Sequence, residues 1–298
     1  MMPSLSHLIA AELSEPVDPR VSAMAEALAG RYPGAARSVL FYGSCLRQQQ
    51  LEGLMLDFYL IVSDYRAAYG KSWLAMANRL IPPNVFPFSH DGLAAKYAVL
   101  SEADFDRLNS LEAGNVSVWA RFAQPARLVW TAGEDARQAA VKAVAKAAPT
   151  LLALAAPATK GEGLDLWRTG FALTYNAELR AERKERSGSI VDADEERYRS
   201  FTGPALEAAG LIGRPGFSAG EVVANARRWR SLQRQGKLLT LLRLAKASFT
   251  FAGGIDYLAW KINRHAGTEI SLKPWQRRWP ILGAVSLLPR LLSRGAVR

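Results

Sequence analysis

A glycine, a serine and an aspartate form the part of this sequence best suited to chemistry. Gly43 and Ser44 directly follow the apolar run Ser38–Tyr42, and Asp57 lies after twelve intervening residues, inside the apolar run Leu56–Val62. A strand that ends in Gly-Ser lets backbone N–H groups and the serine hydroxyl hold phosphate oxygens, because glycine allows the backbone to approach closely. A carboxylate on the next strand can bind a Mg²⁺ ion that bridges those phosphates. The pattern indicates phosphoryl-group chemistry, and its simplest alternative is a tight turn followed by a strand-edge aspartate.

This pattern resembles that of the nucleotidyltransferase (polymerase-beta-like) superfamily, in which Gly-Ser precedes an acid–apolar–acid strand. Asp57 matches the first acid, and Tyr59 occupies the position of the second. The resemblance implies an α+β fold with a nucleotidyltransferase domain and Asp57 as a magnesium ligand. One carboxylate is fewer than two-metal chemistry usually uses. Asp64 and Asp104 are the candidates for a second ligand.

Four segments along the chain resemble, in order and in spacing, those of one family within this superfamily. They are Tyr42–Ser44 (YGS) with Leu56–Phe58 (LDF), then Lys96–Ser101 (KYAVLS), Trp119–Pro125 (WARFAQP) and Leu173–Arg180 (LTYNAELR). The family is that of the mitochondrial-type phosphatidate cytidylyltransferases, which are CDP-diacylglycerol synthases also called mitochondrial translocator assembly and maintenance proteins. The resemblance covers residues 38 to 200, and the basic, aromatic C-terminal part is similar more loosely. The chain resembles a divergent, bacterial-type member.

The resemblance implies a reaction in which CTP and phosphatidate give CDP-diacylglycerol and pyrophosphate. A phosphatidate oxygen would attack the α-phosphorus of CTP in line, with catalysis arising from positioning and charge neutralisation. Asp57 would bind Mg²⁺, while Tyr42, Gly43 and Ser44 would hold the nucleotide phosphates. Lys96 would neutralise a phosphate of either substrate, although a lysine at the start of a strand can also be a simple surface residue.

Further along the chain, Arg121 and Arg180 are expected to clamp phosphates, because a guanidinium group binds phosphate oxygens in pairs. Glu178 would orient one of these two arginines, and Tyr175 would stack on the cytosine ring. A structural salt bridge for the arginines and a core position for the tyrosine are the plain alternatives.

Three departures separate this chain from the family pattern. Cys45 stands where the family has a second glycine, and Gln124 stands where it has a lysine. The Trp-His segment that follows the aspartate strand in the family has no clear counterpart in residues Asp64–Tyr69. These departures weaken the support for a lipid acceptor more than the support for nucleotide chemistry.

The elements that must position these residues are those of a mixed α/β domain. Short apolar, β-prone runs predict four strands, at Ser38–Tyr42, Leu56–Val62, Lys96–Leu100 and Ala126–Trp130. A helix is expected over Val21–Arg31, and Pro82–Asn84 and Ser89–Gly92 are expected to form turns.

After Gly133 the sequence becomes rich in alanine and poor in β-prone runs, which predicts helices at Gly163–Arg186 and Glu195–Ala209. We therefore expect a nucleotidyltransferase domain at residues 1–132, a helical domain at 133–235 and a basic amphipathic tail at 236–298. The overall prediction is an α+β protein.

Composition excludes several classes of protein. Hydrophobic residues make up 49% and charged residues 22% of the chain, which is typical of a globular fold. A single cysteine excludes a disulfide framework, and three histidines leave little for a histidine metal cluster. The N-terminal residues lack the pattern of a secretory signal, and we expect no membrane-spanning segment. The expected location is the cytoplasm, at the inner face of a membrane.

The positive charge is concentrated near the C-terminus. Residues 226–298 hold fifteen Lys and Arg against two acids, which gives them a charge of +13. The formal net charge of the whole chain is +11, so residues 1–225 sum to −2. Helical spacing from Gly236 to Thr250 aligns leucines on one stripe, and the cations and tryptophans Trp275, Arg277, Arg278 and Trp279 follow. Tryptophan and arginine beside apolar residues are typical of a lipid headgroup boundary, so we expect an anionic membrane surface as a partner. A helix that docks on the protein's own core is the alternative for Gly236–Thr250.

Two other functions remain open at this point. One is a nucleotidyltransferase that acts on RNA or a small molecule, with the basic tail on nucleic acid; the apolar runs and tryptophans of the tail make nucleic acid the less favoured partner. The other is a non-catalytic scaffold at the membrane, suggested by Tyr59 and Cys45. The sequence does not predict the oligomeric state.

Overall fold

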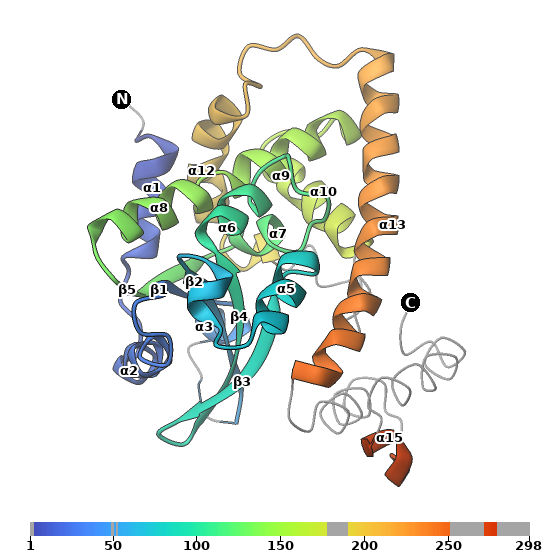
Figure 1. The fold of residues 1–298 in the computed structure, drawn as a ribbon. Helices are drawn as coiled ribbons and strands as arrows, with labels where there is room; N and C mark the ends of the chain where they lie inside the picture. The colour runs from blue at the N-terminus through green and yellow to red at the C-terminus, as the bar shows by residue number, and fades with distance from the viewer. Residues whose placement is uncertain (1–2, 49–50, 52, 178–189, 251–270, 279–298) are drawn as a thin grey trace.

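A computed structural model of the chain describes residues 3–48, 51, 53–177, 190–250 and 271–278 (Figure 1). Its centre is a five-stranded mixed sheet with the strand order β3-β4-β2-β1-β5. The β2–β4 pair is parallel, and the other three pairs are antiparallel. The strands are β1 (Ala36–Tyr42), β2 (Met55–Val62), β3 (Asn84–His90), β4 (Leu93–Ser101) and β5 (Ala126–Thr131).

Helices precede, interrupt and follow the sheet. Within the described residues the chain after β5 forms only helices, so the α+β fold predicted from the sequence is confirmed. The helices that accompany the sheet are α1 (Leu5–Leu13), α2 (Pro19–Ala29), α3 (Ser44–Gln48), α4 (Tyr65–Ala68), α5 (Ser72–Leu80), α6 (Glu102–Leu108) and α7 (Trp119–Phe122). Those that follow it are α8 (Glu134–Val144), α9 (Ala147–Ala155), η1 (Ala156–Ala158), α10 (Leu164–Tyr175), α12 (Glu195–Ala208), α13 (Ala219–Thr250) and α15 (Pro274–Arg278).

The sheet is buried on both faces, because alternate residues of each strand enter two different cores. On one face Phe41 and Phe58 pack in a cluster with Met24 of α2. On the other face Leu40 and Tyr59 belong to a larger cluster that also contains residues of α7, α9, α10 and α12. Two-sided burial explains why these strands read as nearly continuous apolar runs.

The four predicted strands are all present, but the structure adds β3, which the sequence analysis missed. Only its two ends were covered by a prediction, as parts of turns, and that prediction is wrong for Asn84 and for Ser89 and His90, which pair with β4. The strand was hidden because Pro87 interrupts its pattern and because an edge strand has only one partner. The turn itself consists of Asp91 and Gly92, which both have positive φ.

The described core does not stop at residue 132. Helix α1 packs against α8 and α12 as well as β5. A buried ion pair joins these parts: Arg197 Nη2 of α12 donates to Glu12 Oε1 of α1 at 3.1 Å, and Arg197 Nη1 donates to the Ala123 carbonyl at 3.2 Å. The domain boundaries stay predictions.

The longest helix, α13, runs along one side of the molecule (Figure 1). Its first half is attached to α9, because the side chains of Asn225 and Trp229 both donate to the Leu154 carbonyl, at 3.0 and 2.9 Å. Further along, a Cβ on Gly236 would lie 2.1 Å from the Ala177 carbonyl oxygen, so only glycine lets α13 cross the end of α10 this closely. Helix α13 continues without a break across residues 235 and 236, where the sequence predicts the start of the tail.

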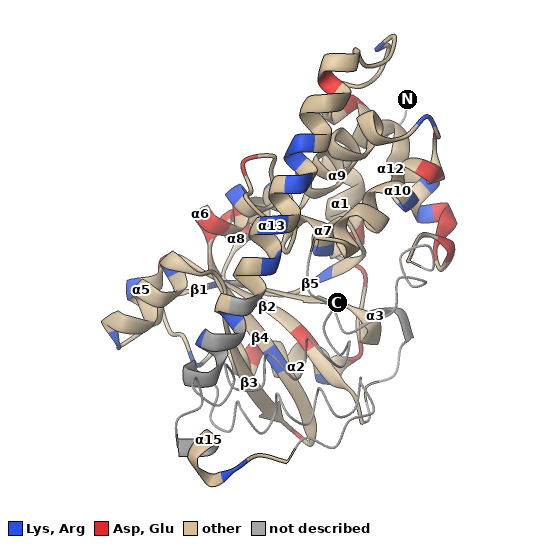
Figure 2. Cartoon of the chain, turned by 90° about the vertical axis from the view of Figure 1, so that its right-hand side faces the viewer, with Lys and Arg blue, Asp and Glu red and all other residues tan. Residues whose placement is uncertain are grey.

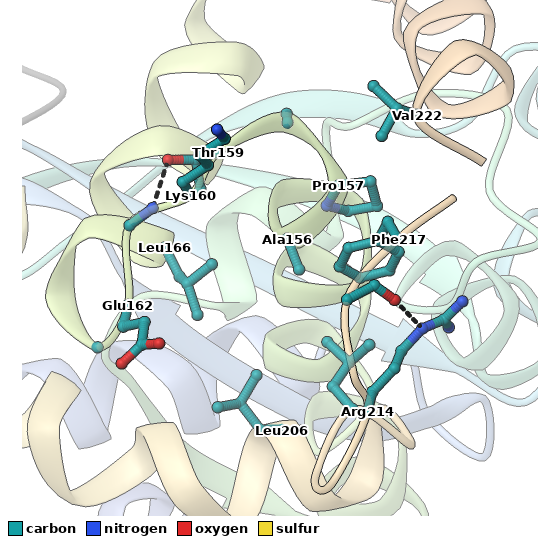
Figure 3. Close-up of a pocket in the computed structure, with 15 residues that line it drawn as sticks. Ala156, Pro157, Thr159, Lys160, Glu162, Leu166, Leu206, Arg214, Phe217 and Val222 are labelled. Carbon is teal, nitrogen blue, oxygen red and sulfur yellow. Dashed lines mark hydrogen bonds between the residues drawn. The ribbon is translucent and has the colours of Figure 1, made fainter. Parts of the chain in front are cut away.

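The helical half also contains a cavity of about 770 Å³, shown in Figure 3. Its wall is mostly apolar, with Leu166, Leu206 and Phe217 among its lining residues. Arg214 at this cavity donates to the Gly216 carbonyl at 3.2 Å and pairs with Glu221. No residue of the sheet lines the cavity, and neither Ser44 nor Asp57 is among its lining residues.

One helical stretch among the described residues, Glu134–Ala158, is long and apolar enough to cross a membrane. More than half of its most apolar window, 56%, is buried inside the protein. Core helices of soluble proteins pass the same test of length and composition, so this stretch is weak grounds for a membrane span.

Candidate active site

Three of the predicted residues lie side by side across the middle of the sheet. In the strand registers Tyr42 of β1 pairs with Asp57 of β2, and Asp57 pairs with Lys96 of β4. All three side chains lie on the sheet face that carries Leu40 and Tyr59, since alternate residues share a face. We call Tyr42, Asp57 and Lys96 the polar row.

Asp57 and Lys96 form an ion pair. The Lys96 Nζ lies 3.0 Å from Asp57 Oδ1, and the two side chains are 20% and 31% exposed. A partly buried pair of this kind is screened by water less than a surface pair. The pair therefore fixes a negative and a positive charge at one point on the sheet while leaving both accessible from outside.

Gly43 brings the backbone against the carboxylate. Its φ is +97°, in the region that favours glycine, and a Cβ there would lie 3.3 Å from Asp57 Oδ2. The next residue, Ser44, is exposed and begins helix α3. Glycine is thus needed for the turn and for the space beside Asp57.

Arg121 of α7 lies near the Tyr42 hydroxyl at the other end of the polar row, and its guanidinium donates to the Ser117 carbonyl. Burial raises the pKa of Tyr42 well above its ordinary value, the nearby Asp57 carboxylate raises it further, and Arg121 opposes both. Tyr42 therefore stays protonated and can donate a hydrogen bond. The arginine lies where a cation could contact an anion bound on the row.

Tyr59 fills the position that an acid occupies in the superfamily pattern. It is 2% exposed and packs against the rings of Tyr42, at 5.3 Å, and Phe122, at 5.2 Å between centroids. A carboxylate there would be buried against aromatic rings, at high cost without a partner. Asp57 is consequently the acid that this strand presents.

Asp64 and Asp104 do not assist Asp57. Asp64 caps α4, where its Oδ1 accepts from the Arg66 and Ala67 N–H groups, at 2.7 and 3.0 Å. Asp104 accepts from the Tyr65 hydroxyl at 2.6 Å. Asp64 follows the far end of β2 and Asp104 that of β4, and the five residue steps from Asp57 to Val62 alone span about 16 Å. The prediction that one of them supplies a second metal ligand is wrong.

The residues at this point suit one hard divalent cation. They offer the Asp57 carboxylate, the Ser44 hydroxyl and a space that a side chain on Gly43 would fill. Mg²⁺ commonly binds through one or two carboxylates and the phosphates of a substrate, not through a closed protein cage. The part of the chain that the structure describes holds no cluster of three or more His, Cys, Asp or Glu side chains that could bind a metal ion.

Cys45, which replaces a glycine of the family pattern, does not enter the polar row. Its side chain is 3% exposed and belongs to the cluster on the opposite face of the sheet. Burial raises the pKa of the thiol, and the Asp57 carboxylate raises it further. The loop thus accommodates the side chain by directing it into the core.

The remaining predicted residues lie elsewhere or outside the described part. Tyr175 ends α10, is partly buried and packs against the larger core cluster. Trp275 on α15 is 44% exposed. Arg180 and Trp279 lie outside the described residues, as does Glu178, and the side chains of Arg277 and Arg278 are not described. Their roles stay predictions.

Comparison with known proteins does not place the chain in a family. No protein-family model matches it. No curated protein sequence matches it significantly.

Proposed function

We propose that the chain is a nucleotidyltransferase, and specifically a CTP:phosphatidate cytidylyltransferase that makes CDP-diacylglycerol and pyrophosphate at a membrane surface. The observation that carries the proposal is the polar row with Gly43 and Ser44 beside it. A turn that can hold phosphates, one accessible carboxylate and one cation meet there on neighbouring strands. The lipid acceptor and the choice of CTP are supported by the sequence resemblance.

Each residue of the site has a distinct task in this proposal. The Gly43 turn and the Ser44 hydroxyl hold the β- and γ-phosphates, since no side chain blocks the backbone there. Asp57 would hold Mg²⁺, and a bound ion would supply positive charge to the phosphates. Lys96 orients Asp57 through their ion pair, and it adds a positive charge beside the α-phosphate.

Bond making and breaking need little more from the protein. A phosphate oxygen of phosphatidate forms a bond to the α-phosphorus, the bond from that phosphorus to the bridging oxygen of the β-phosphate breaks, and pyrophosphate leaves. The nucleophile is already anionic at neutral pH, so no strong base is required. Arg121 and the Tyr42 hydroxyl lie at the end of the row where they can orient one of the two anions.

The test is transfer of label from radiolabelled CTP into the organic phase, with magnesium and phosphatidate in mixed micelles. Wild type should form labelled lipid, and Asp57→Asn should lower the rate at least about a hundredfold, as expected for a lost preorganised charge. Asp91→Asn is the matched control, because Asp91 lies in the exposed β3–β4 turn and asparagine tolerates its positive φ.

The negative outcomes point to the two other functions. Absence of labelled lipid with CTP binding intact by calorimetry would exclude phosphatidate as the acceptor and favour RNA or a small molecule. Absence of both would favour a non-catalytic scaffold. Equal rates for wild type and Asp57→Asn would remove Asp57 from the mechanism.

A further inference from the structure

Helix α5 turns its apolar side outward. Trp73, Met76 and Leu80 are 45%, 61% and 71% exposed, whereas Asn78 on the inner side is fully buried. At 100° per residue the three exposed side chains fall within about 60° of the helix circumference. An amphipathic helix of a globular protein normally buries this side, so the outward orientation marks an interaction surface.

The inward orientation of Asn78 is held by specific hydrogen bonds. Its Nδ2 donates to the Val99 carbonyl of β4 at 3.0 Å, and its Oδ1 accepts from the Tyr69 hydroxyl at 3.3 Å and from the Asn84 N–H. If α5 rotated to bury Trp73 and Met76, these bonds would break and the Asn78 amide would leave its hydrogen-bonding partners in the core. The outward face is therefore built into the fold.

Cations surround this apolar face. Lys71 and Arg79, both exposed, lie on α5 or at its start. Arg79 also lines a cavity of about 560 Å³ with Arg66, Tyr65, Tyr69 and Met76, and no acidic side chain lines that cavity. Two acids lie nearby: Asp64, which caps α4, accepts two backbone hydrogen bonds, and Asp104 accepts from the hydroxyl of the lining residue Tyr65.

The second half of α13 is attached to the chain next to the end of α5. Arg243 Nε donates to the Pro82 carbonyl at 2.9 Å, and Lys246 Nζ donates to the Pro83 carbonyl at 2.8 Å, so α13 is joined to the chain directly after α5. Leu238 and Leu242, one turn apart on the same helix, are 59% and 41% exposed. Figure 2 shows that Lys and Arg lie along α13. In the same view, α5 projects beside α13.

We propose that the outward face of α5 binds an anionic lipid bilayer. Trp73, Met76 and Leu80 would enter the headgroup boundary, and Arg66, Lys71 and Arg79 would bind lipid phosphates. Large apolar side chains with tryptophan, bordered by Lys and Arg, are suited to this boundary and not to bulk water. The surface deepens the proposed function and rests on it for its purpose, since the acceptor lipid would come from the same bilayer. It is distinct from the predicted tail contacts at Trp275 and beyond.

Sedimentation with lipid vesicles tests this surface directly. The full chain is mixed, without nucleotide, with vesicles of equal parts phosphatidylcholine and phosphatidylglycerol, and the partition coefficient is measured. Met76→Asp together with Leu80→Asp should lower it at least about tenfold, from the apolar area that no longer enters the lipid. The matched substitutions Ile212→Asp and Val223→Asp, made together, remove apolar side chains that are 63% and 49% exposed elsewhere and add the same charge. They should change the coefficient less than about twofold.

The cations and Trp73 provide two further readouts. Arg66→Gln with Arg79→Gln should weaken binding to the anionic vesicles, whereas Arg199→Gln, on the exposed side of α12, should not. Brominated lipid should quench less of the total tryptophan emission in Trp73→Phe than in wild type. Unchanged partition in the α5 variants, or unchanged quenching without Trp73, would overturn the proposal.

Other occupants of the face give different results. If the α5 variants abolish a dimer in sedimentation velocity and leave vesicle binding intact, the face joins two copies of the chain and the proposal is wrong. Loss of vesicle binding in these variants, with no labelled lipid formed by wild type, would keep the membrane surface and overturn the proposed reaction. If wild type forms labelled lipid but the variants bind vesicles as well as wild type does, the proposed reaction stands and the α5 membrane surface is wrong.

Discussion

Lys96 Nζ lies 3.0 Å from Asp57 Oδ1, and the two residues face each other in the register of the parallel strands β2 and β4. The strand pairing thus places a cation beside the acid that the sequence singles out, although the two are far apart along the chain. An ammonium group here can orient the carboxylate and still reach a bound phosphate. Variants of these residues that affect activity and stability differently would separate these tasks from simple structural support.

Replacing Lys96 should impair catalysis much more than folding. Lys96→Met keeps the aliphatic stem but removes the charge, and we expect formation of labelled lipid to fall about a hundredfold. Because both side chains are partly exposed, the free energy of unfolding in urea should change by no more than about 1 kcal/mol. Lys96→Arg should retain part of the activity. Full activity in Lys96→Met would limit this lysine to a structural role.

A methyl group on Gly43 should damage the site beyond the strain that it causes. Gly43→Ala and Gly34→Ala both place alanine at positive φ, which costs about 1 to 2 kcal/mol in each case. A Cβ at residue 43 also meets Asp57 Oδ2, whereas a Cβ at residue 34 meets nothing within 4 Å. Similar losses of stability are therefore expected in urea unfolding, with loss of CTP binding in Gly43→Ala alone. Equal CTP binding in the two variants would contradict the role given to this turn.

Cys45 should report on the charge of Asp57. Burial first, and then the Asp57 carboxylate, raise the pKa of the thiol above its ordinary value of 9.0, so little thiolate exists at neutral pH. The alkylation rate should be low and should rise with pH, because only the thiolate reacts. Asp57→Asn removes one cause of the raised pKa, so at pH 8 this variant should react faster than wild type. Cys45 is the sole cysteine, which makes the rate unambiguous.

The control for that measurement is Asp91→Asn, which removes a distant carboxylate and should leave the alkylation rate unchanged. A rate that is the same in Asp57→Asn and wild type would mean that the thiol does not sense the acid.

The ion pair between Glu12 and Arg197 should be the most sensitive polar contact in the core. Both side chains are 7% exposed, so Arg197→Met leaves a buried carboxylate without its partner and should cost about 3 to 5 kcal/mol in urea unfolding. Arg199→Met, on the same helix, breaks the exposed pair with Glu195 and should cost less than about 1 kcal/mol. The double variant Glu12→Met with Arg197→Met should recover stability relative to the single one. Equal losses in the Arg197 and Arg199 variants would show that burial of the pair carries no weight.

Local pattern was enough to predict much of the fold. The runs Leu56–Val62 and Lys96–Leu100 are apolar and β-prone, and such runs form strands wherever both faces of a sheet are covered. The same reasoning missed β3, because its exposed residues and Pro87 remove the apolar signal while backbone pairing with β4 stabilises the strand. Ser44 and Asp57 could be chosen as site residues from their types and spacing.

What the sequence by itself determined is therefore which segments form most of the strands and helices and which side chains are candidates for a site, because these depend on neighbours along the chain. The tertiary structure alone decided that Lys96 lies beside Asp57, since strand order and register depend on pairing between distant segments. It also decided that Asp64 and Asp104 lie at the far end of the strands. In α5 the periodicity of Trp73, Met76 and Leu80 predicts an apolar side but not where that side points. The buried Asn78 makes its hydrogen bonds only with this orientation of α5, because a rotated helix would leave the amide and its partners in β4 and at Asn84 unpaired.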